Sequence, residues 1–214
     1  TLMDHSITTK NDAKKVFRKL GTCSRTFFYI LNREFGHTKE TEERAADPLA
    51  GGILQKGHQC GMLWGASMAV GAEAFRKFEN PGRVTGISIL ATQHLMTSFQ
   101  NRTKSIECEE ITSYDLTKKS GLAKFFFSGK FVGCFKLAGK WAPEAIKAAR
   151  EGLSLDPSGF RQEPLSCASV LIKEMGGNEE EMAMVSGFAG GLGLSGKACG
   201  ALSAAVWMNS LKWS

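Results

Sequence analysis

The stretch "GGILQKGHQCG" at residues 51–61 occurs a second time in altered form, as "GGLGLSGKACG" at residues 190–200. Both stretches begin with Gly-Gly, carry Gly at the seventh position and end with Cys-Gly. With the preceding alanine they match as A-G-G-x-x-x-x-G-x-x-C-G without a gap, over 50–61 and 189–200. Self-similarity of this kind indicates a repeated supersecondary unit.

Each stretch follows an amphipathic segment that contains another cysteine, Cys23 in the first case and Cys167 in the second. We interpret this as an internal, partial duplication. The first copy continues through Cys108 and Cys134, whereas the second has no counterpart of either. The sequence therefore predicts a complete four-cysteine unit at 1–155 and a truncated second copy at 156–214 that packs on the first.

Apolar residues recur at three- and four-residue intervals, which predicts helices and not strands. Helices are expected over 11–35, from about 58 to the breaker "ENPGR" at 79–83, over 84–103, and over 121–150 with a break near Pro143. A loop or short capped turn is expected at 37–48, a polar connection around Cys108, and the second copy from about 162 to 211. No segment shows convincing period-two alternation, so the predicted fold class is all-α, a helical bundle.

The composition is that of a globular protein, with 214 residues, 43% hydrophobic residues and 22% charged residues. The net charge of +6 is thinly spread, which does not favour nucleic-acid binding.

The sequence contains no stretch of about 18 uncharged apolar residues, so it predicts no transmembrane span. No leader is visible and reduced thiols suit the cytoplasm, so we expect a cytoplasmic location.

The repeated motif suits a helix start that bears a reactive cysteine. Glycines permit positive φ angles and close backbone approach, and a cysteine in the first turn meets unpaired N–H groups that stabilise a thiolate. An alternative interpretation remains open, in which the small residues only allow tight helix packing and the cysteines are buried, inert thiols. The chain has no CxxC and no CxxCH, so a zinc ribbon, a thioredoxin motif and covalent c-type haem are not expected.

Residues 11–150 resemble a whole member of the redox-active protein family named for its C_GCAxxG_C_C pattern. The matching positions are Cys23, the run from Gly57 through Cys60, Gly61 and Met62 to Gly65, then Cys108 and Cys134. Met62 stands where the family has Ala, and Ala204 in the second copy stands where the first has Gly65. The cysteine framework is also similar to that of split-Soret cytochrome, which holds an iron–sulfur cluster besides its haems.

The resemblance implies a redox-active protein, with electron transfer as the expected function. It implies an iron–sulfur cluster, [2Fe–2S] or [4Fe–4S], as the cofactor. The implied ligand set is Cys23, Cys60, Cys108 and Cys134. Zinc on the same ligands and a dithiol–disulfide switch without electron transfer stay open as alternatives.

Cys167 and Cys199 form a secondary candidate set. They could build a second site, a redox disulfide or ligands shared across a dimer, or they could be remnants of a decayed copy. His94 is a further outside candidate for a metal or haem, whereas His58 is expected in a surface loop. No catalytic motif is recognised, so whether the chain is an enzyme stays open. The expected partners are a redox protein and a second copy that buries the Phe-rich stretch at 125–135.

Overall fold

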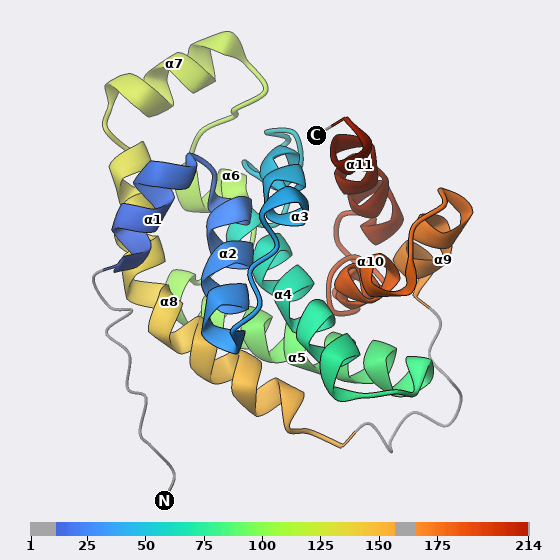
Figure 1. Cartoon of the computed structure of the whole chain (residues 1–214). Helices are drawn as coiled ribbons and strands as arrows, with labels where there is room; N and C mark the ends of the chain where they lie inside the picture. The colour runs from blue at the N-terminus through green and yellow to red at the C-terminus, as the bar shows by residue number, and fades with distance from the viewer. Residues whose placement is uncertain (1–11, 157–165, 214) are drawn as a thin grey trace, which may run out of the picture.

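The computed structural model describes residues 12–156 and 166–213, and every regular element within these two ranges is a helix (Figure 1). This confirms the all-α prediction. The elements up to residue 103 are α1 (Asp12–Leu20), α2 (Cys23–Phe35), α3 (Glu40–Ala45), the 3₁₀ turn η1 (Asp47–Leu49), α4 (Gly61–Lys77) and α5 (Pro81–Thr103). The elements after residue 103 are α6 (Cys108–Thr112), α7 (Lys119–Phe127), α8 (Phe131–Leu153), α9 (Cys167–Glu174), α10 (Glu179–Met184), the 3₁₀ turn η3 (Ser186–Phe188) and α11 (Gly200–Lys212).

Helix α4 lies at the centre of the bundle, and 14 of its 17 residues are buried. It contacts α2, α5 and α10, which surround it. Its small residues permit this, because a Cβ at Gly65 would lie 1.9 Å from the carbonyl oxygen of Ser24 in α2. On another face, a Cβ at Gly71 would lie 2.2 Å from the carbonyl oxygen of Ala183 in α10. A helix buried on all sides needs such positions, because the neighbouring backbones approach it closely.

A cluster of aromatic rings joins α2, α5 and α8. The indole of Trp141 lies 4.7 Å, between ring centroids, from both Phe27 and Phe99. Its Nε1–H donates a hydrogen bond to the Oγ of Ser98 at 3.2 Å. These three rings are fully buried, so they anchor the long helix α8 to the core.

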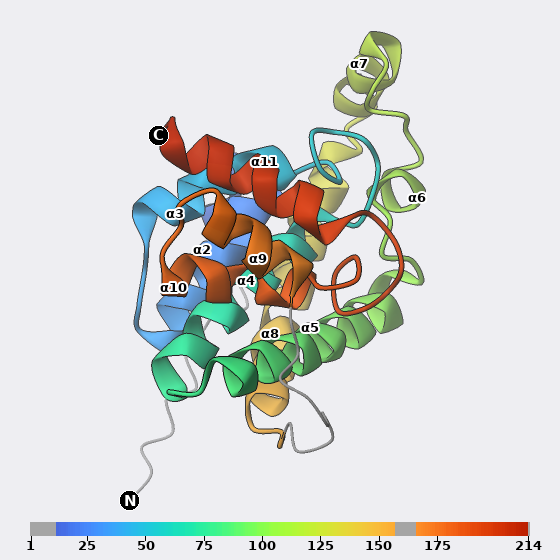
Figure 2. The same cartoon turned by 90° about the vertical axis from the view of Figure 1, so that its right-hand side faces the viewer.

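The C-terminal helices α9, α10 and α11 pack on the first part of the chain and share one hydrophobic core with it (Figures 1 and 2). Phe188 of η3 meets Trp64 of α4 edge to face, with centroids 4.7 Å apart. Trp207 of α11 donates its indole N–H to the carbonyl oxygen of Glu42 at 3.1 Å. Whether 1–155 and 156–214 are separate units of common origin stays a prediction.

Two of the predicted helices are divided. Residues 12–35 form α1 and α2, because Gly21 has a φ of 87° and Thr22 is extended. The predicted helix over 121–150 breaks at Ser128–Lys130, where Gly129 has a φ of 70°, and not at Pro143, which lies inside α8. The expected loop at 37–48 contains α3 and the start of η1, and the polar connection at Cys108 contains α6. Residue 11 and residues 162–165 of the predicted segments lie outside the described residues.

No helix in the described part of the chain combines the length and the apolar character that crossing a bilayer requires.

Candidate functional site

Four thiols from four different elements line one cavity of about 240 Å³. Cys23 is the first residue of α2, and Cys60 directly precedes α4. Cys108 begins α6, and Cys134 lies in the first turn of α8. Cys60 and Cys108 are buried, whereas Cys23 and Cys134 are half-buried. The fold thus gathers the primary candidate set of the sequence analysis around a common space; that the four bind a cofactor stays a prediction.

The sulfur of Cys23 accepts hydrogen bonds from several donors. The thiol of Cys60 donates to it, and this contact is the main cause of a pKa lowered below the usual value for cysteine. Burial acts in the opposite direction, and the backbone N–H groups of Gly51 and Ser24 add further stabilisation of the thiolate. Cys23 is therefore the thiol of the group whose pKa is lowered, as expected for a sulfur at the N-terminus of a helix.

The other three thiols are held in the protonated form. The pKa of Cys60 is raised well above its usual value because its S–H donates to Cys23, and burial raises it further. Burial also raises the pKa of Cys108, and it raises the pKa of Cys134 to about 12. The negative charge of Cys23 adds to all three shifts. The motif analysis expected a stabilised thiolate at Cys60, but the pKa of Cys60 is raised and that of Cys23 is lowered, because Cys60 is the donor of the pair.

Cys60 and Cys108 are positioned by a short antiparallel pairing of two chain segments. The N–H of Cys60 donates to the carbonyl oxygen of Ile106 at 2.8 Å. The N–H of Cys108 donates to the carbonyl oxygen of His58 at 2.7 Å. Between them, Gln59 and Glu107 form an isolated bridge. Sequence analysis did not find this pairing, because a single bridge between two short segments gives too short a pattern to recognise.

The Gly-Gly loop before Cys60 is a left-handed turn. Residues 51–55 all have φ angles between 51° and 73°, and three of them are not glycine. Gly52 must be glycine, because a Cβ there would lie 2.3 Å from the carbonyl oxygen of His58. The loop closes with a hydrogen bond from the N–H of Gly57 to the carbonyl oxygen of Gly51 at 3.0 Å. This geometry directs the N–H of Gly51 towards the sulfur of Cys23.

The second Gly-Gly stretch adopts the same backbone. Residues 190–194 have φ angles between 57° and 85°, and the N–H of Gly196 donates to the carbonyl oxygen of Gly190 at 2.9 Å. This loop packs beside the first site, since the amide of Gln59 donates to the carbonyl oxygen of Gly191 at 2.9 Å. The repeated sequence pattern thus corresponds to a repeated local conformation, and common origin by duplication stays a prediction.

Apart from the four thiols, nearly all side chains that line the cavity are apolar. No charged side chain lines it, and its polar lining residues are Thr22, Gln55 and Thr112. The apolar wall is contributed mainly by α1, α7 and α8, through Phe17, Leu122, Phe125, Phe126, Phe131 and Phe135. Charge on a sulfur in this space interacts strongly with neighbouring dipoles, because little water screens it.

Cys167 and Cys199 are exposed, and neither lines the cavity. They occupy the same places relative to their helices as Cys23 and Cys60, since Cys167 begins α9 and Cys199 directly precedes α11. The second copy supplies no thiols corresponding to those of α6 and α8. The fold does not bring the secondary set to the four-cysteine cavity.

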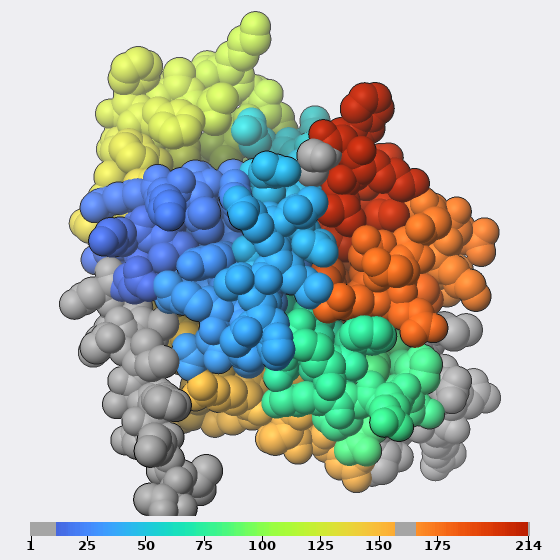
Figure 3. Space-filling view, viewed as in Figure 1, coloured from blue at the N-terminus to red at the C-terminus, as the bar shows by residue number. Residues whose placement is uncertain are grey.

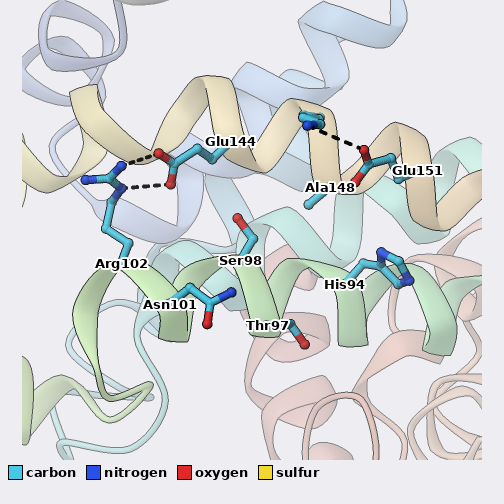
Figure 4. A pocket seen from close by; sticks show the side chains of 9 residues that line it. His94, Thr97, Ser98, Asn101, Arg102, Glu144, Ala148 and Glu151 are labelled. Carbon is cyan, nitrogen blue, oxygen red and sulfur yellow. Dashed lines mark hydrogen bonds and ion pairs between the residues drawn. The ribbon is translucent and has the colours of Figure 1, made fainter.

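His94 lies on α5 in a broad surface hollow of about 640 Å³ between α5 and α8 (Figure 4). Across this hollow the guanidinium of Arg102 makes two contacts with the carboxylate of Glu144, one of them at 2.7 Å. Lys147 and Glu151 form a second ion pair at 3.8 Å. The four charged side chains that line the hollow therefore form two ion pairs with each other. His58, as expected, is exposed.

Within residues 12–156 and 166–213, no three His, Cys, Asp or Glu side chains are arranged around a single metal ion. The four sulfurs border a volume, with one close pair at Cys23 and Cys60. A group bound by all four sulfurs therefore has to be large enough to span the space between them.

Comparison with protein-family models matched residues 22–146 to the family described as "Putative redox-active protein (C_GCAxxG_C_C)". No curated protein and no solved structure matched the chain. Residues 60–65 read Cys-Gly-Met-Leu-Trp-Gly, so the order of the first Gly and Cys differs from the pattern in the family's name. The match covers more than half of the 214 residues and includes all four thiols of the cavity. The chain therefore belongs to the redox-active C_GCAxxG_C_C family.

Proposed function

We propose that the chain is an electron-transfer protein in which Cys23, Cys60, Cys108 and Cys134 hold an iron–sulfur cluster. The observation that carries this proposal is the meeting of these four thiols at one apolar cavity, although they come from four separate elements. Four cysteine ligands are the usual holders of both [2Fe–2S] and [4Fe–4S] clusters.

The donor set and the cavity fit such a group. Thiolates are soft ligands that suit iron–sulfur clusters, and they also suit zinc. The sulfurs border a space of about 240 Å³. A single metal ion needs ligands that point at one centre, whereas a cluster of several atoms can bind ligands placed around a larger space. When bound, the cluster would supply one-electron oxidation and reduction.

The chain's own residues would hold and tune the group. The pKa of Cys23 is lowered by its hydrogen bond from Cys60, so Cys23 is expected to lose its proton most readily and to bind first. The remaining thiols release protons on binding, so loading is expected to be favoured at higher pH. The backbone N–H groups of Gly51 and Ser24, which point at the sulfur of Cys23, favour negative charge there and so raise the reduction potential. The aromatic wall limits the access of water to the space.

Anaerobic purification tests the proposal directly. We expect a brown protein with broad absorbance at ~400–450 nm that bleaches on reduction, and with iron and acid-labile sulfide in equal amounts. Iron and sulfide counts then distinguish two-iron from four-iron clusters. A colourless protein that contains zinc would select zinc on the same ligands, and a protein free of both metals after anaerobic reconstitution would refute the cluster.

A dithiol–disulfide switch is the second candidate function, because the thiols of Cys23 and Cys60 are already hydrogen-bonded to each other. The thiolate of Cys23 is the nucleophile in such a reaction. The S–S bond would form as the two sulfurs give two electrons to an oxidant and the remaining proton leaves Cys60.

Oxidation of the metal-free protein with diamide tests this second function. We expect a Cys23–Cys60 disulfide in peptides identified by mass spectrometry, and protection of both thiols once the protein is loaded with iron. Cys167 and Cys199 serve as exposed reference thiols in the same digest. If the Cys23–Cys60 disulfide forms no faster than disulfides that involve Cys167 or Cys199, the result would argue against a switch at this position.

A further inference from the structure

The cavity lies at the end of the molecule from which α7 projects. Figures 1 and 2 show α7 standing out from the bundle above the first turns of α8, with α1 beside them. Phe125 and Phe126 of α7 and Phe131 and Phe135 of α8 line the cavity. Cys134, between the last two, keeps part of its surface accessible. A molecule that docks on this end therefore lies close to the sulfurs.

The part of this end formed by α7 and the start of α8 is basic, whereas the sequence analysis expected the positive charge to be thinly spread. Residues 116–143 contain six lysines and no acidic residue, which equals the net charge of +6 for the whole chain. All six are exposed: Lys118, Lys119, Lys124, Lys130, Lys136 and Lys140. Only Lys118 has an ion pair among the salt bridges of the described residues, with Asp115 at 2.9 Å. The other five positive charges face solvent.

Helix α1 adds to the same charge. It carries Lys15, Arg18 and Lys19 as exposed residues, and it packs against α8. The guanidinium of Arg18 lies over the ring of Phe135, 5.7 Å from its centroid. Since Phe135 lines the cavity, Arg18 of α1 lies next to its wall.

Exposed aromatic rings stand among these lysines. Phe127 is 93% exposed and Phe126 is 55% exposed, and both lie at the end of α7. The space-filling view shows α7 and the start of α8 forming one raised area next to α1 (Figure 3). Cationic residues around exposed aromatic residues are typical of a protein-binding surface with a charged rim.

We propose that α7, the first two turns of α8 and α1 form the docking surface for an acidic redox protein. This inference rests on the proposed electron-transfer function and adds the surface and the charge of the partner. Charge complementarity carries it, because the unpaired lysines Lys124, Lys130 and Lys136 each adjoin a phenylalanine that lines the cysteine cavity. A second copy of this chain is disfavoured as the occupant, since its own lysines would face these across the interface.

Calorimetric titration at low salt tests the docking surface and needs no bound metal. The probes are an acidic flavodoxin, the basic protein cytochrome c, and phosphatidylcholine vesicles containing phosphatidylserine. The test variant is K119E/K130E, since both positions lie at helix starts where a carboxylate is compatible with the helix dipole. The control variant R44E/K173E makes the same charge change at exposed sites on α3 and α9, away from α7 (Figure 1).

We expect flavodoxin to bind the unaltered protein and cytochrome c not to bind. K119E/K130E should weaken flavodoxin binding by about tenfold or more, R44E/K173E by no more than about threefold, and ~0.5 M salt should abolish it. An equal loss in the two variants, no binding of flavodoxin, or binding to anionic vesicles in preference to flavodoxin would overturn the proposal; the last outcome would assign the surface to lipid. If flavodoxin binds as expected but the protein holds no cluster, the docking surface stands and the electron-carrier function falls.

Discussion

Replacing any one of Cys23, Cys60, Cys108 or Cys134 by serine is expected to lower the iron content of the anaerobically purified protein by at least about tenfold. Each of the four sulfurs lines the same cavity, so the loss of any one leaves an incomplete set of ligands. Serine is close in size to cysteine, and the helices should remain formed. Iron per chain after gel filtration and the far-ultraviolet circular dichroism spectrum together provide the measurement.

The chain offers matched controls for this series. Cys167 and Cys199 are exposed and lie outside the cavity, so C167S and C199S should retain full iron content and absorbance. If they lose iron as completely as the four cavity variants, the ligand set is wrong or is shared between copies of the chain. If none of the six substitutions changes the iron content, the bound metal is adventitious.

Gly65→Ala is expected to destabilise the protein by about 3 kcal/mol or more. The added Cβ would lie 1.9 Å from the carbonyl oxygen of Ser24 and 2.9 Å from the nitrogen of Phe28. Both are backbone atoms of α2, so no side chain can rotate away, and α2 and α4 must separate. Because Cys23 begins α2 and Cys60 directly precedes α4, the same separation should break their hydrogen bond and weaken iron retention.

Urea unfolding followed by circular dichroism measures this effect, with Gly133→Ala as the control. Gly133 lies in α8, and a Cβ there meets no atom within 4 Å. Its replacement should stabilise the protein by about 0.5–1 kcal/mol through helix propensity. A Gly65→Ala protein as stable as the unaltered one would show that α2 and α4 are not in close contact in solution.

The helices were predictable from the chain wherever local signals agreed. The helix expected over 84–103 is α5, which begins three residues earlier, at Pro81, because Asn80 caps it by accepting the N–H of Arg83. The prediction of a break near Pro143 within 121–150 is wrong. Pro143 removes one hydrogen bond from α8, but Trp141 and Ala142 beside it are fully buried, and this packing keeps the helix continuous across Pro143.

The sequence by itself determined the helical class and the repeated Gly-Gly stretch, because these depend on residue types and short spacings, and its resemblance to the family singled out the four cysteines as a set. Only the tertiary structure decided that the four sulfurs share an apolar cavity, that the pKa of Cys23 is lowered while that of Cys60 is raised, and that α7 contributes to the wall of that cavity. The reason is physical. The pKa of a thiol and the neighbours of a cavity depend on groups that come from distant parts of the chain, and no local pattern records which of them will meet.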